Sequence, residues 1–190
     1  MEIDQNTYSA HDVAAAANVS PATLQNWLKR RVVVGHREAD IEGGGVKGKH
    51  RRFSFFALMQ ISIAKALIDA GVTDLKQAFD AAMIFAHSGD GAGEWVEDDG
   101  LREGVEDVRH PGYPFHFSMG DTLLATAGGK TCVVLDKPGT SLFTTVKSNL
   151  QIANGFTVID AGVVFDRVCM ALGSHPNIVL DDAYPAAVPA

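Results

Sequence analysis

Two helix starts stand close together near the N-terminus, with a residue between them that can adopt a left-handed conformation. Ser9 has the side chain of a helix N-cap, and Asp12 follows three residues later, as in a capping box. Asn18 can end that helix in a left-handed conformation. Ser20 then caps a second helix, in which Pro21 takes the first position, where a missing N–H costs nothing. This pattern predicts two short helices joined by a tight turn, as in a helix-turn-helix.

The second helix, predicted over residues 21–31, has one apolar face. Leu24, Trp27 and Leu28 follow the i, i+3, i+4 spacing of a buried stripe, so we expect Trp27 to lie in the core. Short polar side chains and then basic ones occupy the other faces. Short polar and amide groups can reach base edges in the major groove, and Gln or Asn can pair with adenine through two hydrogen bonds. The helix is therefore predicted to face a polyanion.

A Gly-rich basic segment follows. Val32–Val34 are predicted to form a short strand, Gly43–Gly45 and Gly48 a flexible tip, and residues 49–53 a returning strand. Residues 29–65 contain nine Lys or Arg and three Asp or Glu, although the 190-residue chain has a net charge of -7. Residues 71–190, in contrast, contain seven basic and sixteen acidic residues. This asymmetry predicts a basic binding face on the N-terminal half and a different role for the C-terminal half.

The rest of the chain divides at a loop. Ser54 is predicted to cap a helix over about 55–70, and Thr73 to begin another over 74–87. Residues 88–107 are rich in Gly and acids, as in a linker. Beyond them, residues 122–136 predict a hairpin that turns at Gly128–Gly129, and 141–146 resemble a strand. Thr157 is predicted to begin a last helix near 158–172, and residues 174–190 to lack fixed structure.

These elements predict an α+β fold in two domains. Residues 1–87 form the first domain, 88–107 the linker, and 108–173 a small mixed α/β domain for dimerisation or sensing. The apolar helix near 158–172 has to be buried, either in its own core or against a partner. Because one short recognition helix reads only a few base pairs, we expect a homodimer, with this helix as the candidate interface.

Several short motifs occur in a familiar order. They are Tyr8-Ser9, the run from Asn18 to Trp27, the hairpin closure from His50 to Ser54, and the helix end from Leu67 to Thr73. In this order they resemble the DNA-binding domain of MerR-type regulators, a winged helix-turn-helix. The resemblance covers residues 8–79 and implies DNA binding, with the second helix in the major groove and the wing on the backbone. Two departures are Gln25, where the family usually has Arg, and the long wing segment 35–48.

The leading expectation is a sequence-specific transcriptional regulator that binds double-stranded DNA. Excisionases and some phage packaging subunits share the same module, so an architectural DNA-binding protein is the first alternative. A DNA-tethered enzyme or small-molecule receptor is the second. The predicted DNA-contacting residues are Ser20, Thr23, Gln25, Asn26, Lys29, Arg30, Arg31, Lys49, His50, Arg51 and Arg52.

Other chemistry finds little support in the sequence. There is no Gly-rich phosphate loop, nucleophile elbow or His-Glu zinc motif, so we expect neither an enzyme nor a cofactor. Cys132 and Cys169 are isolated in apolar patterns and are expected to be buried thiols, and His110 and His116 lack further metal ligands. No apolar run is long enough to span a bilayer, and the acidic N-terminus is not a secretory signal. We expect a cytoplasmic protein, associated with the nucleoid when bound to DNA.

Overall fold

Short-range capping signals set the starts of the first helices. A computed structural model describes residues 3–33, 40–43, 50–89, 109–152 and 155–185. In it, the capping box at Ser9 and the N-caps at Ser20 and Ser54 are confirmed. Predicted features that lie outside the described residues are Val34, Gly44, Gly45, Lys47, Gly48, Lys49 and residues 90–107 of the acidic segment.

Helices dominate the first half of the chain, and a hairpin sheet follows in the second. The first half contains the 3₁₀ helix η1 (Ile3–Gln5), β1 (Thr7–Ser9), α1 (Ala10–Ala16), α2 (Pro21–Lys29), β2 (Ile41–Glu42), β3 (Arg52–Ser54), α3 (Phe55–Asp69) and α4 (Leu75–His87). The second contains β4 (Asp121–Ala127), β5 (Lys130–Asp136), α5 (Leu142–Leu150), β6 (Thr157–Asp160), α6 (Ala161–Ala171) and α7 (Pro176–Ala183). The described residues thus form seven α-helices and two three-stranded antiparallel sheets, and the α+β class is confirmed.

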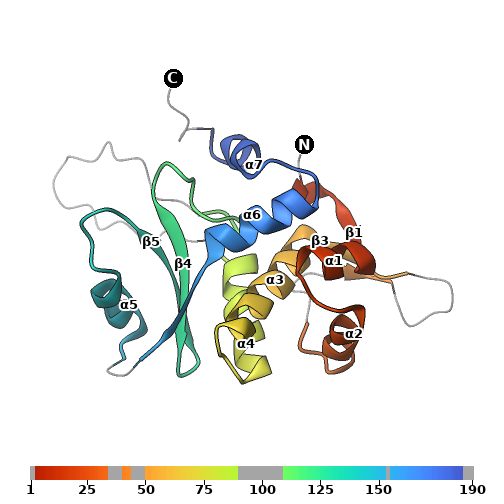
Figure 1. Cartoon of the computed structure of the whole chain (residues 1–190), viewed down its shortest axis with the longest axis horizontal. Coiled ribbons are helices and arrows are strands. Elements are labelled where there is room, and N and C mark those ends of the chain that lie inside the picture. Colours follow the sequence, from red (N-terminus) through yellow and green to blue (C-terminus); the bar gives the residue numbers. More distant parts are fainter. Residues whose placement is uncertain (1–2, 34–39, 44–49, 90–108, 153–154, 186–190) are drawn as a thin grey trace.

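The two sheets lie in different parts of the molecule (Figure 1). The first has the strand order β1-β3-β2, with Tyr8 and Ile41 both opposite Phe53. The second has the order β5-β4-β6, with Leu124 opposite both Val133 and Ile159. The hairpin predicted to turn at Gly128–Gly129 is confirmed as β4 and β5, since those glycines connect the two strands.

The main core lies around α3, most of whose residues are buried. Helix α6 packs on α3, and the ring of Phe165 stands edge-on to that of Phe55, with 6.3 Å between the ring centroids. Residues assigned from the sequence to two domains therefore share one buried cluster. A smaller cluster lies between the second sheet and α5, where Val146 and Leu150 pack against Ala125 of β4.

The side chain of Arg109 links the segment that begins at residue 109 to the end of α4. Its guanidinium is fully buried and donates to the carbonyl oxygens of Phe85 and Tyr113, each at 3.0 Å. It also donates to the carbonyl oxygen of Ser88. Carbonyl groups at the end of a helix lack partners within the helix and carry a partial negative charge. Arg109 therefore stabilises the C-terminal end of α4.

Three secondary-structure predictions for the second half of the chain were wrong. Residues 141–146 belong to helix α5, capped by Ser141, because Val146 and Leu150 gain burial against the sheet. The last apolar segment is split into β6 and α6, since Asp160 caps the helix by accepting from the Val163 N–H. Part of the expected flexible tail forms α7, whose Val179 and Leu180 are buried. No helix in the described part of the chain is long and apolar enough to cross a membrane.

Candidate nucleic-acid interface

The turn between α1 and α2 is closed by backbone hydrogen bonds. Asn18 has a φ of 52°, so the predicted left-handed helix end is confirmed. The Val19 N–H donates to the carbonyl oxygen of Ala14 at 2.9 Å, which completes the hydrogen bonding at the end of α1. At its start, Ser9 hydrogen-bonds to the carboxylate of Asp12, and these bonds lower the pKa of Asp12. The sequence thus orients α2 relative to α1 by local interactions.

The inner face of α2 anchors the helix to the core. Leu24 and Trp27 are buried, and the Trp27 ring stands edge-on to that of Phe79 on α4, with 5.2 Å between the centroids. The prediction that Trp27 lies in the core is confirmed. The inner contacts fix which residues of α2 face solvent.

The outer face of α2 is a ridge of three exposed residues. Ala22, Asn26 and Lys29 have the i, i+4, i+7 spacing and lie opposite the buried side chains. Gln25, also exposed, flanks them. We call Ala22, Asn26 and Lys29 the α2 ridge. Sequence reasoning missed Ala22, although the helical period places it in line with Asn26.

Thr23 has a more restricted position. Ser20 Oγ accepts from the Thr23 N–H at 3.0 Å and lies 2.8 Å from the Thr23 hydroxyl oxygen. Thr23 is half-buried, whereas Asn26 and Gln25 are exposed. Because its hydroxyl is engaged with the helix cap, Thr23 is less available to a ligand than the amide side chains.

Two arginines at the end of α2 are exposed. Arg31 has a φ of 54°, and its N–H donates to the Leu28 carbonyl oxygen at 3.2 Å. The next N–H, of Val32, donates to the Trp27 carbonyl oxygen at 3.3 Å, beyond the C-cap Arg30. Contrary to the prediction, residues 32 and 33 form no strand. Glycine is the usual residue at this left-handed position, and other side chains are strained there. The basic side chain of Arg31 is therefore kept at a local cost.

The third strand brings further basic residues. Arg52 on β3 is exposed and donates to the Thr7 hydroxyl at 3.2 Å and to the Thr7 carbonyl oxygen at 2.7 Å. His50 is exposed and Arg51 half-buried just before this strand. Arg52 thus joins β3 to β1, and its guanidinium is held at the surface. Lys49, predicted beside it, lies outside the described residues.

One of the acids counted in the predicted wing is not at the surface. Asp40 is only 2% exposed, and its carboxylate accepts from Ser54 Oγ at 2.8 Å. The other carboxylate oxygen lies 3.8 Å from Nδ1 of His87, at the end of α4. Because Asp40 is buried, the predicted wing has one exposed carboxylate fewer than the sequence count indicates. Helix α2 lies at the end of the molecule away from α5 (Figure 1).

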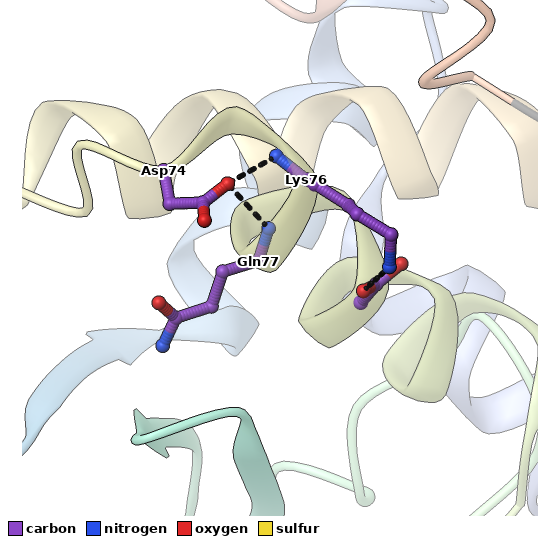
Figure 2. Close-up of polar contacts among 4 residues, drawn as sticks. Asp74, Lys76 and Gln77 are labelled. Carbon is purple, nitrogen blue, oxygen red and sulfur yellow. Dashed lines mark hydrogen bonds and ion pairs between the residues drawn. The ribbon is translucent and has the colours of Figure 1, made fainter.

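A cavity of about 340 Å³ lies between the start of α4 and the β4–β5 turn. Figure 2 shows its polar residues: Asp74 accepts from the N–H groups of Lys76 and Gln77, at 2.8 and 3.2 Å. The Lys76 ammonium is paired with Asp80. These two backbone N–H groups and the Lys76 ammonium therefore already have acceptors within the chain.

A serine, a histidine and an aspartate meet beside α7. Nδ1 of the fully buried His116 lies 2.7 Å from Ser118 Oγ, and its Nε2 lies 2.9 Å from Asp181 Oδ1. The contacts run from serine to histidine to aspartate, as in a catalytic triad. Acyl transfer, however, also needs N–H donors that stabilise an oxyanion. Here the Ser118 N–H donates to the His116 ring, and the Met119 N–H donates to the His116 carbonyl.

The same histidine helps to hold α7 in place. Tyr184 accepts from the His110 N–H at 2.9 Å and donates to the Pro114 carbonyl at 2.8 Å. Together with the His116–Asp181 contact, these bonds tie both ends of the 110–116 segment to α7. We therefore assign the His116 group a role in packing. Its partner Asp181 lies too far along the chain for sequence spacing to reveal the contact.

The two thiols have different environments. Cys169 is fully buried, as predicted, and burial raises the pKa of its thiol to about 12. Cys132 is only half-buried, against expectation, because it lies on the edge strand β5. Within the ranges that the structure describes, no three His, Cys, Asp or Glu side chains come together in a way that could hold a metal ion.

Known proteins add no assignment to this geometry. No family model matches the chain, and no curated protein matches its sequence.

Proposed function

We propose that the N-terminal half is a winged helix-turn-helix of the MerR-like type, and that the protein is a sequence-specific DNA-binding transcriptional regulator. The observation that supports this best is the outer face of α2. Its centre carries small and amide side chains, its end carries Lys29, Arg30 and Arg31, and its opposite face is buried. A helix that enters the major groove needs this division between a base-reading centre and phosphate-binding ends.

The dimensions of α2 suit the major groove. The helix has nine residues and is therefore about 14 Å long, against a groove about 12 Å wide. Asn26, at the middle of the ridge, can donate to N7 and accept from N6 of one adenine. Ala22, one turn earlier, can contact the methyl group of a neighbouring thymine. Gln25 offers a second amide at the flank, so the expected half-site contains adenine and thymine.

The basic residues supply the affinity that does not depend on sequence. Lys29, Arg30 and Arg31 are exposed at one end of α2, and Arg52 is held at the surface of β3. Phosphate contacts of this kind release counterions, so binding weakens as salt rises. The burial of Asp40 supports the proposal, since a surface carboxylate there would repel the backbone.

Selection of bound duplexes from a random pool tests the proposal and yields the preferred site. An inverted repeat supports a dimeric regulator, whereas tandem direct repeats filled cooperatively indicate an architectural protein. Failure to enrich any sequence, with equal affinity for all duplexes, contradicts sequence-specific binding.

Variants then separate the two kinds of contact. Asn26→Ala should remove the preference at one adenine, and 7-deazaadenine, which lacks N7, should produce the same loss with the unaltered protein. Arg30→Ala should weaken binding to all sequences and reduce the salt slope by about 1. Lys130→Ala is the matched control, because it removes an exposed charge at the β4–β5 turn. Equal losses for Asn26→Ala and Arg30→Ala on every sequence contradict the base-reading role.

A further inference from the structure

The outer face of α6 has an apolar line along its centre. Val163 is 60% exposed and Met170 is 71% exposed, and they stand two helical turns apart on the same side of the helix. The opposite side carries the buried residues of α6, among them Phe165 and Val168. We call Val163 and Met170 the α6 stripe. Two aligned apolar side chains on the solvent-facing side of a helix are suited to contact another helix.

Opposite charges flank the α6 stripe. Asp166 and Arg167 are both exposed, and the helical period places them on opposite sides of the line that joins Val163 to Met170. Among the described residues, neither forms an ion pair within the chain. Partial burial raises the pKa of Asp166, and the neighbouring Asp160 adds to the effect. An arginine brought close from outside would stabilise this carboxylate.

We propose that α6 pairs with α6 of a second copy of the chain, with the two helices parallel about a two-fold axis. In this arrangement Val163 faces its own counterpart and Met170 faces its own. The axis also places Asp166 beside the partner's Arg167, and Arg167 beside the partner's Asp166. An antiparallel pair would instead place the two Asp166 carboxylates together and the two Arg167 side chains together. The charges therefore favour a second α6 as the partner and the parallel orientation of the two helices.

A second copy supplies the complementary surface by symmetry. The same patch on both subunits has one acid and one base beside an apolar line. Each copy therefore offers the other an opposite charge for each of its own charged side chains and an apolar line to pack against. Because α6 has only eleven residues, the contact is at the small end of specific interfaces. We therefore expect dissociation constants on the order of micromolar. Dimerisation through α6 does not depend on DNA binding, and it is measured without DNA.

Sedimentation equilibrium of the full chain tests the pairing. The unaltered protein should change from monomer to dimer as its concentration rises through the micromolar range. Met170→Glu should weaken dimerisation at least tenfold, since it places two carboxylates at the contact. Phe143→Glu is the matched control, because Phe143 is 59% exposed on α5 and should leave the dimer intact. A protein that stays monomeric throughout, or a dimer unaffected by Met170→Glu, overturns the proposal.

Charge exchange and cross-linking test the direction of the helices. Asp166→Arg alone should weaken the dimer, and adding Arg167→Asp should restore it. Under mild oxidation Val163→Cys alone should give a disulfide-linked dimer, since parallel helices bring the two positions together. A cross-link that requires Val163→Cys and Met170→Cys in the same chain indicates antiparallel helices and overturns the arrangement. The unaltered chain, with its own Cys132 and Cys169, is the control for oxidation.

Discussion

Helices α2 and α6 are similar on their buried sides and differ on their exposed sides. Each buries an aromatic side chain in the same cluster, Trp27 in α2 and Phe165 in α6. On the outside, α2 presents the α2 ridge and basic residues, whereas α6 presents the α6 stripe. Burial accounts for the inner faces, because apolar side chains leave water wherever the fold allows. The outer faces contribute little to folding, and their contrast fits the two proposals, in which α2 binds DNA and α6 pairs with a second chain.

The strongest test of this comparison concerns the inner faces. Trp27→Ala and Phe165→Ala should each lower the free energy of unfolding by about 3–5 kcal/mol, because both remove a large ring from one shared core. Urea unfolding followed by far-ultraviolet circular dichroism should show a single transition in each variant. Ile178→Ala, at an exposed position of α7, should change stability by less than about 0.5 kcal/mol.

Two unfolding transitions in Phe165→Ala would show that the two halves of the chain unfold independently. If Phe165→Ala unfolds one part of the chain while residues 3–87 keep their helices, two transitions will be seen. The two halves would then be independent domains, and the rings of Phe55 and Phe165 would contribute little to each other's stability.

The outer face of α2 allows stability and binding to change in opposite directions. Ala22→Glu places a carboxylate in the first turn of α2, where the helix dipole should stabilise it by about 0.3–1 kcal/mol. The same carboxylate would face DNA phosphates, and like charges across an interface cost several kcal/mol. DNA binding measured by fluorescence anisotropy should therefore fall at least about a hundredfold. Thr23→Val is the milder comparison, since the Thr23 hydroxyl is engaged with Ser20. Unchanged affinity in Ala22→Glu would contradict the placement of the α2 ridge in the groove.

The inner face of α6 adds a dependence of stability on alkaline pH. Burial raises the pKa of the Cys169 thiol from 9.0 to about 12, so above pH 9 the unfolded chain loses this proton first. The contribution of the neutral thiol is present in full below about pH 9 and is lost as the pH rises toward 12. Urea unfolding between pH 7 and the alkaline range should therefore show a smaller fall in stability for Cys169→Ala. Cys132→Ala, which removes the half-buried thiol of β5, should keep the fall of the unaltered protein. An identical fall in all three proteins would contradict this role of Cys169.

Local signals predicted the starts of α1, α2 and α3 well. The caps at Ser9, Ser20 and Ser54 act within three residues, so the sequence alone reveals them. Helix α5 was missed because its β-branched residues favour a strand locally, whereas packing of Val146 against the sheet favours the helix. Such tertiary burial has no signature in a short window of sequence.

The same limit applies to the candidate site. The period of α2 separated Trp27 from Asn26, so the outer face of the helix was predictable. The burial of Asp40 was not, because its partners Ser54 and His87 come from distant segments. The surface charge of a basic face thus depends on contacts that only the folded chain reveals.

The smallest expected effects come from the ends of α2 and α6, which have the same backbone turn. Arg31 and Gly173 both follow the helix end with positive φ, 54° and 75°, and the next N–H reaches back to the last turn in each. Arg31→Gly should stabilise the fold by about 1 kcal/mol or less, because it relieves strain. Gly173→Arg should destabilise it by about 1 kcal/mol through strain alone, since no atom lies within 4 Å of an added Cβ. Urea unfolding of both variants measures the two changes.

DNA-binding measurements test why the chain has Arg31 after α2 but Gly173 at the same position after α6. If Arg31 neutralises a phosphate, Arg31→Gly should weaken DNA binding on all sequences and lower the salt slope by about 1, although the protein is more stable. Gly173→Arg adds a positive charge between α6 and α7, outside the proposed DNA-binding residues, and should leave the salt slope unchanged. Arg31→Ala keeps the left-handed strain but removes the charge, so it should lose affinity without gaining stability. If Arg31→Gly gains stability and binds DNA as tightly as before, the strained arginine does not contact phosphate, and the DNA-binding end of α2 stops at Arg30.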